Sequence, residues 1–163
     1  MAAAVYEDRL RRLEDIEEIR CLHAAYLDYV DKGWDGKEPS PAGLREVLAD
    51  DVEFSSTKAL TEEQRENGTT MYRGVDAVIS MLEQATDEFQ FVMHSMQNSV
   101  IKVDGDSAAG TMLIWVGAKQ QDVMNQWYLR AFSKYVRTAG GWRIKEVILN
   151  FAATLNELAD SHH

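Results

Sequence analysis

The order of sequence patterns along the chain predicts an α+β fold, with one layer of helices packed on one curved antiparallel sheet. Helical patterns occupy the first half of the chain, at residues 7–30, 42–48 and 73–82. Four strand patterns then follow one another, at residues 89–103, 108–119, 125–137 and 142–151. Because only short connections separate these strands, each is expected to pair antiparallel with the next. Helices first and a meander of strands afterwards are typical of the α+β class.

The first helical pattern, at residues 7–30, repeats every three or four residues. Its members are Leu10, Leu13, Ile16, Ile19, His23, Tyr26 and Val30. His23 and Tyr26 therefore share the face that is expected to be buried. Lys32 and Gly33 are typical of the residues that follow a helix. Asp31 lies at the same end, where the helix dipole disfavours a carboxylate, so this acid is either solvated or has another reason to be there.

The middle of the chain is predicted to be less regular. Ser40 and Pro41 fit the cap and the first position of the short second helix. A short strand is expected at residues 51–55. Residues 58–70 are polar and rich in glutamate, which predicts a long loop that is either a binding loop or plain disorder. No repeat or linker divides the sequence, so residues 1–163 are predicted to form one domain.

Composition excludes several classes of function and location. The net charge of −10, from 27 acidic and 17 basic residues, disfavours nucleic acid and anionic membrane surfaces as partners. Cys21 is the only cysteine, so no intrachain disulfide can form. The first residues do not resemble a signal peptide, and no apolar run reaches membrane-spanning length. We therefore expect a cytoplasmic protein.

The motifs of most metal and cofactor chemistry are missing from the sequence. It contains no Gly-rich phosphate loop, no His-Glu-x-x-His, no Cys-x-x-Cys and no Gly-x-Ser-x-Gly. Two non-terminal histidines and one cysteine at unrelated spacings disfavour a dedicated metal site. Neither a metal nor an organic cofactor is therefore expected. Side chains alone would have to do any chemistry, which favours proton transfer in an isomerisation, an elimination or a hydration.

His94 is the only histidine in the middle of a predicted strand, between apolar neighbours. The strand ends at Asp104-Gly105-Asp106, which favours a tight hairpin turn. A histidine in this position is either a hydrogen-bonded core residue or a proton-transfer group. Proton transfer is favoured if a carboxylate also orients the ring, because general-base catalysis needs that arrangement.

The order of several short motifs resembles the SnoaL-like branch of the nuclear-transport-factor-2-like superfamily. The resemblance covers about residues 13–151. Its motifs are Tyr26 five residues before Asp31, Trp34-Asp35, Asp50-Asp51-Val52-Glu53-Phe54, Met93-His94, Asp104-Gly105-Asp106 and Gly140-Gly141-Trp142-Arg143-Ile144. Single pieces are weak signals, but their order and spacing together are fairly specific. The resemblance implies a cone, in which a curved antiparallel sheet and N-terminal helices enclose an apolar pocket, as in cystatin-like α+β barrels.

Within that branch, the pattern is most similar to three cofactor-free lyases: scytalone dehydratase, the bile-acid dehydratases and hexachlorocyclohexane dehydrochlorinase. These enzymes use an Asp–His dyad. The resemblance implies that His94 is the catalytic base and that Asp31 holds its ring. It also implies an aromatic or basic residue one helical turn before the aspartate, here a tyrosine that we expect to donate a hydrogen bond to the substrate. Tyr26 matches this tyrosine in the bile-acid dehydratases, whereas Tyr29 matches the one in scytalone dehydratase when Trp34 anchors the alignment.

The expected substrate-binding residues are Tyr29, His23, Trp115, Ala131 and Phe151. Ala131 corresponds to a pocket asparagine of scytalone dehydratase, and Val147 or Phe151 to an arginine that the other two lyases can have. Because these groups differ, the substrates of the three lyases are not expected to be substrates here.

The resulting hypothesis is a cofactor-independent, dehydratase-like lyase that acts on a small hydrophobic substrate with a carbonyl or similar group. The alternatives are an isomerase or polyketide cyclase on the same fold, and a non-catalytic small-molecule-binding module. Large apolar residues on the outer face of the sheet also predict a homo-oligomer. The resemblance to the three lyases implies a trimer, whereas other proteins with this cone form dimers.

Overall fold

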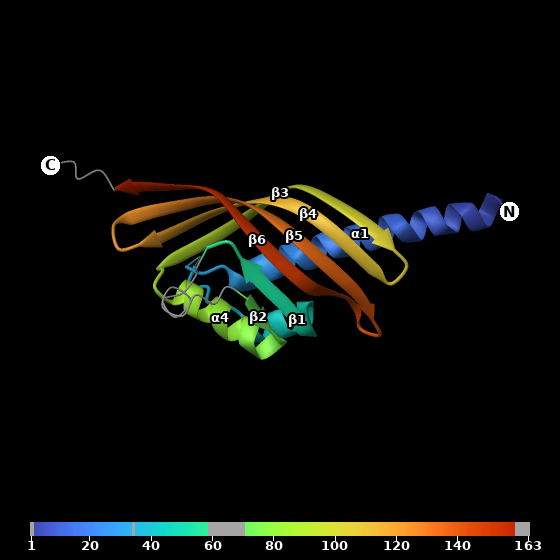
Figure 1. The fold of residues 1–163 in the computed structure, drawn as a ribbon, viewed down its shortest axis with the longest axis horizontal. Helices are drawn as coiled ribbons and strands as arrows, with labels where there is room; N and C mark the ends of the chain where they lie inside the picture. The colour runs from blue at the N-terminus through green and yellow to red at the C-terminus, as the bar shows by residue number, and fades with distance from the viewer. Residues whose placement is uncertain (1, 34, 59–70, 159–163) are drawn as a thin grey trace.

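The structure, a computed structural model, describes residues 2–33, 35–58 and 71–158. The loop expected at residues 58–70 lies outside this part of the chain, apart from Lys58. The described elements, in chain order, are α1 (Ala2–Val30), α2 (Pro41–Val47), β1 (Leu48–Ser56), β2 (Met71–Arg73), α4 (Val75–Asp87), β3 (Phe91–Asp104), β4 (Ser107–Gln120), β5 (Val123–Thr138) and β6 (Gly141–Leu158) (Figure 1). The predicted helices and the four consecutive strands are confirmed. Strand β2 was missed, because three residues are too few to show an alternating pattern.

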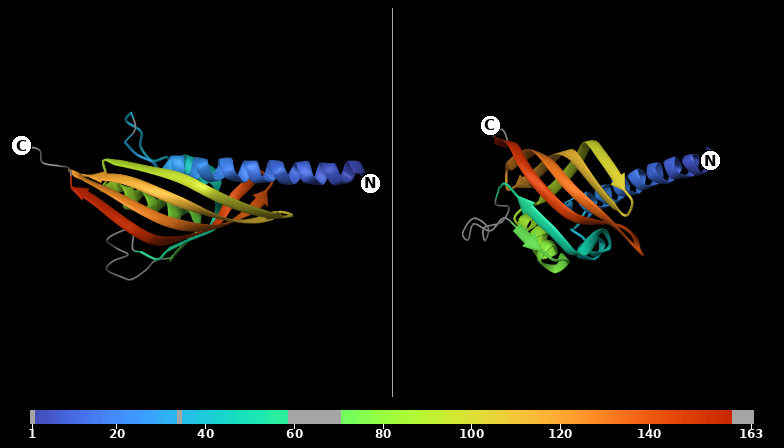
Figure 2. Two further views of the ribbon diagram at one scale, coloured as in Figure 1. Left: turned by 90° about the horizontal axis from the view of Figure 1, so that it is seen from above. Right: turned by 45° about the vertical axis from the view of Figure 1, so that its right-hand side comes forward.

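The strands form one six-stranded sheet in the order β2-β1-β6-β5-β4-β3. All neighbouring strands are antiparallel except β1 and β6, which are parallel. The chain passes through β2, α4 and three further strands between β1 and β6, and a connection of this length permits parallel pairing. The sheet is curved and open, and α1 and α4 lie on its concave side (Figures 1 and 2). The expected α+β fold is therefore confirmed, with one parallel pair that was not expected.

Helix α1 packs on the sheet from about Asp15 to its C-terminal end. Ile19 and Tyr26 are buried there, whereas Leu10 and Leu13 are 57% and 65% exposed. The N-terminal end of the helix projects beyond the sheet (Figure 2). The apolar pattern of α1 predicted a buried face along the whole helix, but its N-terminal part lies outside the core. Leu113, Tyr128 and Phe132 on the strands are also exposed, and the homo-oligomer stays a prediction.

A buried carboxylate fixes α1 near the turn between β5 and β6. Asp15 of α1 accepts hydrogen bonds from Nη2 of Arg137 and, at 3.2 Å, from Nε1 of Trp142. The Arg137 guanidinium lies 4.4 Å from the centre of the Trp142 ring. Burial alone would raise the pKa of Asp15, but these hydrogen bonds and the positive charge of Arg137 outweigh burial and lower the pKa. Asp15 thus stays charged and ties the helix to both strands.

Candidate active site

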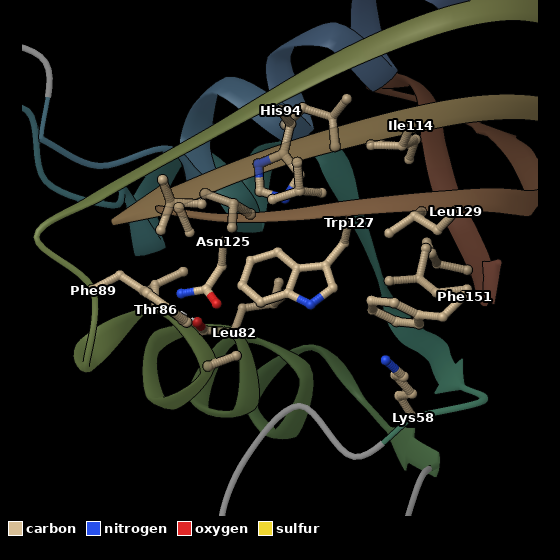
Figure 3. A pocket seen from close by; sticks show the side chains of 18 of the residues that line it. Lys58, Leu82, Thr86, Phe89, His94, Ile114, Asn125, Trp127, Leu129 and Phe151 are labelled. Atoms are coloured by element: carbon tan, nitrogen blue, oxygen red, sulfur yellow. Dashed lines mark hydrogen bonds between the residues drawn. The ribbon is translucent and has the colours of Figure 1, made fainter. Parts of the chain in front are cut away.

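A cavity of about 400 Å³ lies between the concave face of the sheet and helices α1 and α4. This volume is typical of small-molecule sites. Apolar side chains form most of its wall, among them Phe54, Leu82, Val92, Ile114, Val116, Leu129, Val147, Leu149 and Phe151. His23, Tyr26 and Thr86 are the buried polar residues of the wall, and His94 is partly buried. Lys58, Gln84 and Glu88 are exposed and mark the mouth of the cavity. Figure 3 shows the ring of His94 in the cavity above Trp127.

Asp31 and His94 form a hydrogen-bonded pair across 63 positions of sequence. Nδ1 of His94 lies 2.7 Å from Oδ1 of Asp31, and the same oxygen accepts the backbone N–H of His94 at 3.0 Å. The two side chains are only 12% and 16% exposed, so water screens their interaction weakly. The structure therefore brings together the two residues that the sequence suggested as a dyad.

The chain segment after α1 determines this geometry. Lys32 and Val92 form a two-hydrogen-bond bridge, each donating its N–H to the other's carbonyl at 3.0 Å. Gly33, one residue later, has a φ of +91°, and a Cβ at this position would lie 2.4 Å from the carbonyl oxygen of Gln90. Only glycine allows both this φ and this close approach. The bridge and the glycine thus hold the end of α1 against the start of β3, which places Asp31 beside His94.

The side chain of His94 faces the cavity because strand residues alternate between the two faces of a sheet. Val92 and His94 both line the cavity, and His94 lies opposite Val116, which lines it too. In the neutral ring, Nδ1–H donates to the carboxylate, so the opposite nitrogen, Nε2, has the free lone pair. A lone pair fixed in this way, next to a carboxylate that would stabilise an imidazolium, can accept a proton.

Tyr26 lines the same cavity from α1 and is 4% exposed. Burial raises the pKa of Tyr26, so its hydroxyl is protonated at neutral pH and can donate a hydrogen bond. Its ring meets the ring of His23 edge-on, with centroids 5.5 Å apart.

His23 is also part of the wall and is 1% exposed. Its Nδ1 lies 3.2 Å from the hydroxyl of Tyr135, whereas its Nε2 is buried and has no hydrogen-bond partner in the described part of the chain. Burial, and to a smaller extent the nearby His94, lower the pKa of His23 to about 4. This histidine is therefore neutral at physiological pH.

Three of the expected substrate-binding residues lie outside the cavity wall. The ring of Tyr29 packs against α2, so closely that a Cβ on Gly43 would lie 2.7 Å from it. Trp115 follows Ile114 and precedes Val116, and strand alternation turns it to the opposite face, where its Nε1 donates to Gln126. Ala131 faces the core but lies beyond the cavity. None of these three residues therefore lines this cavity, and their role in substrate binding stays a prediction.

Phe151 does line the cavity, and the ammonium of Lys58 lies 5.6 Å from the centre of its ring. Several lining residues were not predicted as site residues: Thr86, Phe89, Gln120, Asn125 and Trp127. The rings of Phe89 and Trp127 meet edge-to-face, with their centroids 5.8 Å apart. A signal for part of this set was present, because Asn125, Trp127 and Leu129 alternate on one strand face.

Two other features of the described residues bear on ligands and location. They contain no group of three or more His, Cys, Asp or Glu side chains that could hold a metal ion. Among their helices, none combines the length and the apolar character that crossing a membrane needs.

Comparison with known proteins shows to which family the chain belongs. The sequence model of a family described as "SnoaL-like domain" matches residues 11–148, which is most of the chain. The chain belongs to the SnoaL-like domain family. No curated protein sequence matches this SnoaL-like chain significantly.

Solved structures similar to the SnoaL-like chain share its fold at low sequence identity. One is hexachlorocyclohexane dehydrochlorinase LinA-type3 from Novosphingobium barchaimii, with a TM-score of 0.75, 17% identity, and coverage of 95% of this chain and 97% of that one. A candidate scytalone dehydratase from Novosphingobium aromaticivorans has a TM-score of 0.68, 19% identity, and coverage of 97% and 93%. An NTF2-like protein with a cystatin-like fold from Novosphingobium aromaticivorans has a TM-score of 0.72, 23% identity, and coverage of 90% and 87%.

Proposed function

We propose that this SnoaL-like protein is a cofactor-independent lyase of the dehydratase type. The observation that supports this most is the 2.7 Å hydrogen bond between Asp31 and a histidine ring in the wall of an apolar cavity. A base with an orienting carboxylate is suited to removing a proton from carbon. The dehydrochlorinase and the candidate dehydratase among the similar structures agree with an elimination.

In the proposed reaction, Nε2 of His94 removes a proton from the carbon next to a carbonyl group. The electron pair of that C–H bond forms a C=C bond, and the C–O bond to a β-hydroxyl breaks. The proton on His94 then neutralises the departing hydroxide, so that water leaves and the histidine is restored. Asp31 fixes the ring and stabilises the transient imidazolium. Tyr26 donates a hydrogen bond to the carbonyl oxygen, where negative charge develops, or to the departing hydroxyl.

Proton transfer by a positioned side chain is typically worth ~10²–10⁴ in rate. The remaining acceleration would come from holding the substrate close to His94 and from excluding water. The apolar wall and the cavity of about 400 Å³ suit a hydrophobic molecule of one or two rings. We therefore propose cyclic or aromatic β-hydroxy ketones as the substrate class.

The test is a panel of cyclic and aryl β-hydroxy ketones, with the conjugated enone product followed by its ultraviolet absorbance. His94→Ala should lower kcat by about 10²–10⁴-fold. Gln97→Ala is the control, because Gln97 lies on the same strand but is exposed and outside the cavity wall.

Each outcome of the panel separates the alternatives. Loss of water that survives His94→Ala would refute the mechanism. An isomerase would rearrange these compounds without forming water. A binding module would bind the ketones, in calorimetry, and convert none of them.

A further inference from the structure

The second histidine of the cavity suggests what the substrate looks like beyond its reacting carbons. We infer that Nε2–H of His23 donates a hydrogen bond to a second, uncharged oxygen acceptor of the substrate, such as an ether or a further carbonyl. This inference rests on the proposed function only in taking the cavity as the substrate site. It adds a specificity-determining contact that the elimination itself does not use.

The first step is the missing partner of Nε2. His23 is 1% exposed, and its Nε2 is one of two buried side-chain atoms without a hydrogen-bond partner in the described chain. Buried polar groups are nearly always hydrogen-bonded, so such an atom needs an explanation. His23 is also part of the cavity wall, so a molecule in the cavity is the partner that this atom lacks.

The second step is the tautomer of the ring. The hydroxyl of Tyr135 is buried, and burial raises the pKa of Tyr135, so it keeps its proton. Its hydrogen-bond partner is Nδ1 of His23, at 3.2 Å; Ser133 lies near enough to offset a part of the effect of burial on the pKa of Tyr135, but its Oγ makes no hydrogen bond of normal geometry. Tyr135 therefore donates to Nδ1, and the proton of the neutral ring is on Nε2. The atom without a partner is a donor.

The third step is the chemistry of the acceptor. The ring of His23 is surrounded by the aromatic rings of Tyr26 and Tyr135 and lines the cavity together with Phe54 and Val147, which are both 1% exposed. A carboxylate in such a place would lose its hydration for one neutral donor, which is unfavourable. An ether or ketone oxygen loses much less and gains the hydrogen bond. The preferred ligand is thus apolar, with a reacting carbonyl and one more neutral oxygen.

The experiment compares two probes that differ by one acceptor. Isochroman-4-one has a ketone and an ether oxygen, and in 1-tetralone a methylene group replaces the ether oxygen. Their dissociation constants are measured by calorimetry, without turnover, for the wild type and two variants. We expect the wild type to bind isochroman-4-one about 2–10-fold more tightly, as one net hydrogen bond predicts. His23→Phe should bring the ratio close to one. Asn125→Ala, which removes another neutral donor of the wall, should leave the ratio unchanged.

Two results would overturn the inference. One is a ratio near one in the wild type, and the other is a ratio that His23→Phe does not change, which means that Nε2 binds a resident water only. A second measurement needs no variant: ¹⁵N spectra of the wild type should show His23 protonated on Nε2, and protonation on Nδ1 would refute the proposed donor. The experiment measures binding and not turnover. A lack of dehydratase activity would therefore refute the proposed function without affecting the inference about His23.

Discussion

His94 and His23 line one cavity but differ in the hydrogen-bond partner of Nδ1 and in how deeply they are buried. His94 lies on a strand, has a carboxylate on Nδ1 and is 16% exposed at its side chain. His23 lies on a helix, has a phenol on Nδ1 and is almost completely buried. The carboxylate holds the ring of His94 through Nδ1 and leaves Nε2 free, whereas burial lowers the pKa of His23 and keeps its ring neutral. Burial and the partner of Nδ1 together thus give two histidines of one cavity different chemical roles.

The difference between the two histidines is tested most directly by removing the charge on Asp31. Asparagine keeps the shape, and its oxygen can still accept from His94, but it cannot stabilise an imidazolium. Asp31→Asn should lower kcat for a β-hydroxy ketone by about 10²–10⁴-fold with little change in KM. Asp28→Asn is the control, because Asp28 lies in the last turn of α1, three residues before Asp31, is exposed and bonds to Lys37. Equal losses in both variants would contradict the role of Asp31.

The placement of Asp31 beside His94 can be tested through Gly33. Gly33→Ala adds the strain of a positive φ and a contact with the carbonyl of Gln90 at 2.4 Å, so we expect it to lower the free energy of unfolding by about 2–5 kcal/mol. Gly36→Ala has the same kind of strain, with a φ of +79°, but its Cβ would meet nothing within 4 Å. It should cost about 1–2 kcal/mol. Urea denaturation measures both, and similar losses would show that close packing at Gly33 is unimportant.

The neutral state of His23 has a consequence for stability at low pH. Its pKa falls from 6.5 to about 4 on folding, so between these values the unfolded chain binds a proton that the folded chain does not. This contribution to stability is complete above pH 6.5 and decreases as the pH falls to about 4. Its size is on the order of 3 kcal/mol. Urea denaturation of the wild type and His23→Phe from pH 7 to pH 4 measures how the free energy of unfolding depends on pH. This dependence should be weaker in the variant. Parallel curves would mean that His23 is not buried in its neutral form.

The smallest effects concern the two tyrosines of α1. Tyr26→Phe removes a donor from the cavity wall and should lower kcat roughly 10-fold, the upper range for one hydrogen bond. Tyr29→Phe should change kcat less than about twofold, because Tyr29 packs against α2 at Gly43. If Tyr29→Phe lowered kcat more than Tyr26→Phe, Tyr29 would be the tyrosine that donates to the substrate.

The sequence predicted the order of the elements well because local periodicity and turn residues determine them. It placed Asp31 and His94 as a pair only through resemblance, since no local pattern connects positions that are 63 residues apart. The structure adds the Lys32–Val92 bridge that makes this contact possible.

The differences between sequence and structure also have physical causes. Trp115 was expected at the substrate, but one step along a strand reverses the face on which a side chain lies. Leu10 and Leu13 continue the apolar pattern of α1, but periodicity does not show where the sheet ends. Tyr26 and Tyr29 are three residues apart on one helix, and only the position of α2 separates their surroundings.

The hydrogen bond from the backbone of His94 to Asp31 gives the protein a built-in reporter of its own dyad. Strand β3 is an edge of the sheet, where amides that face outward usually exchange quickly with solvent hydrogen. The amide of His94 bonds to the Asp31 carboxylate at 3.0 Å, so it can exchange only when that carboxylate moves away. Its exchange rate therefore measures how often the pair opens, in the free protein and before any substrate is known.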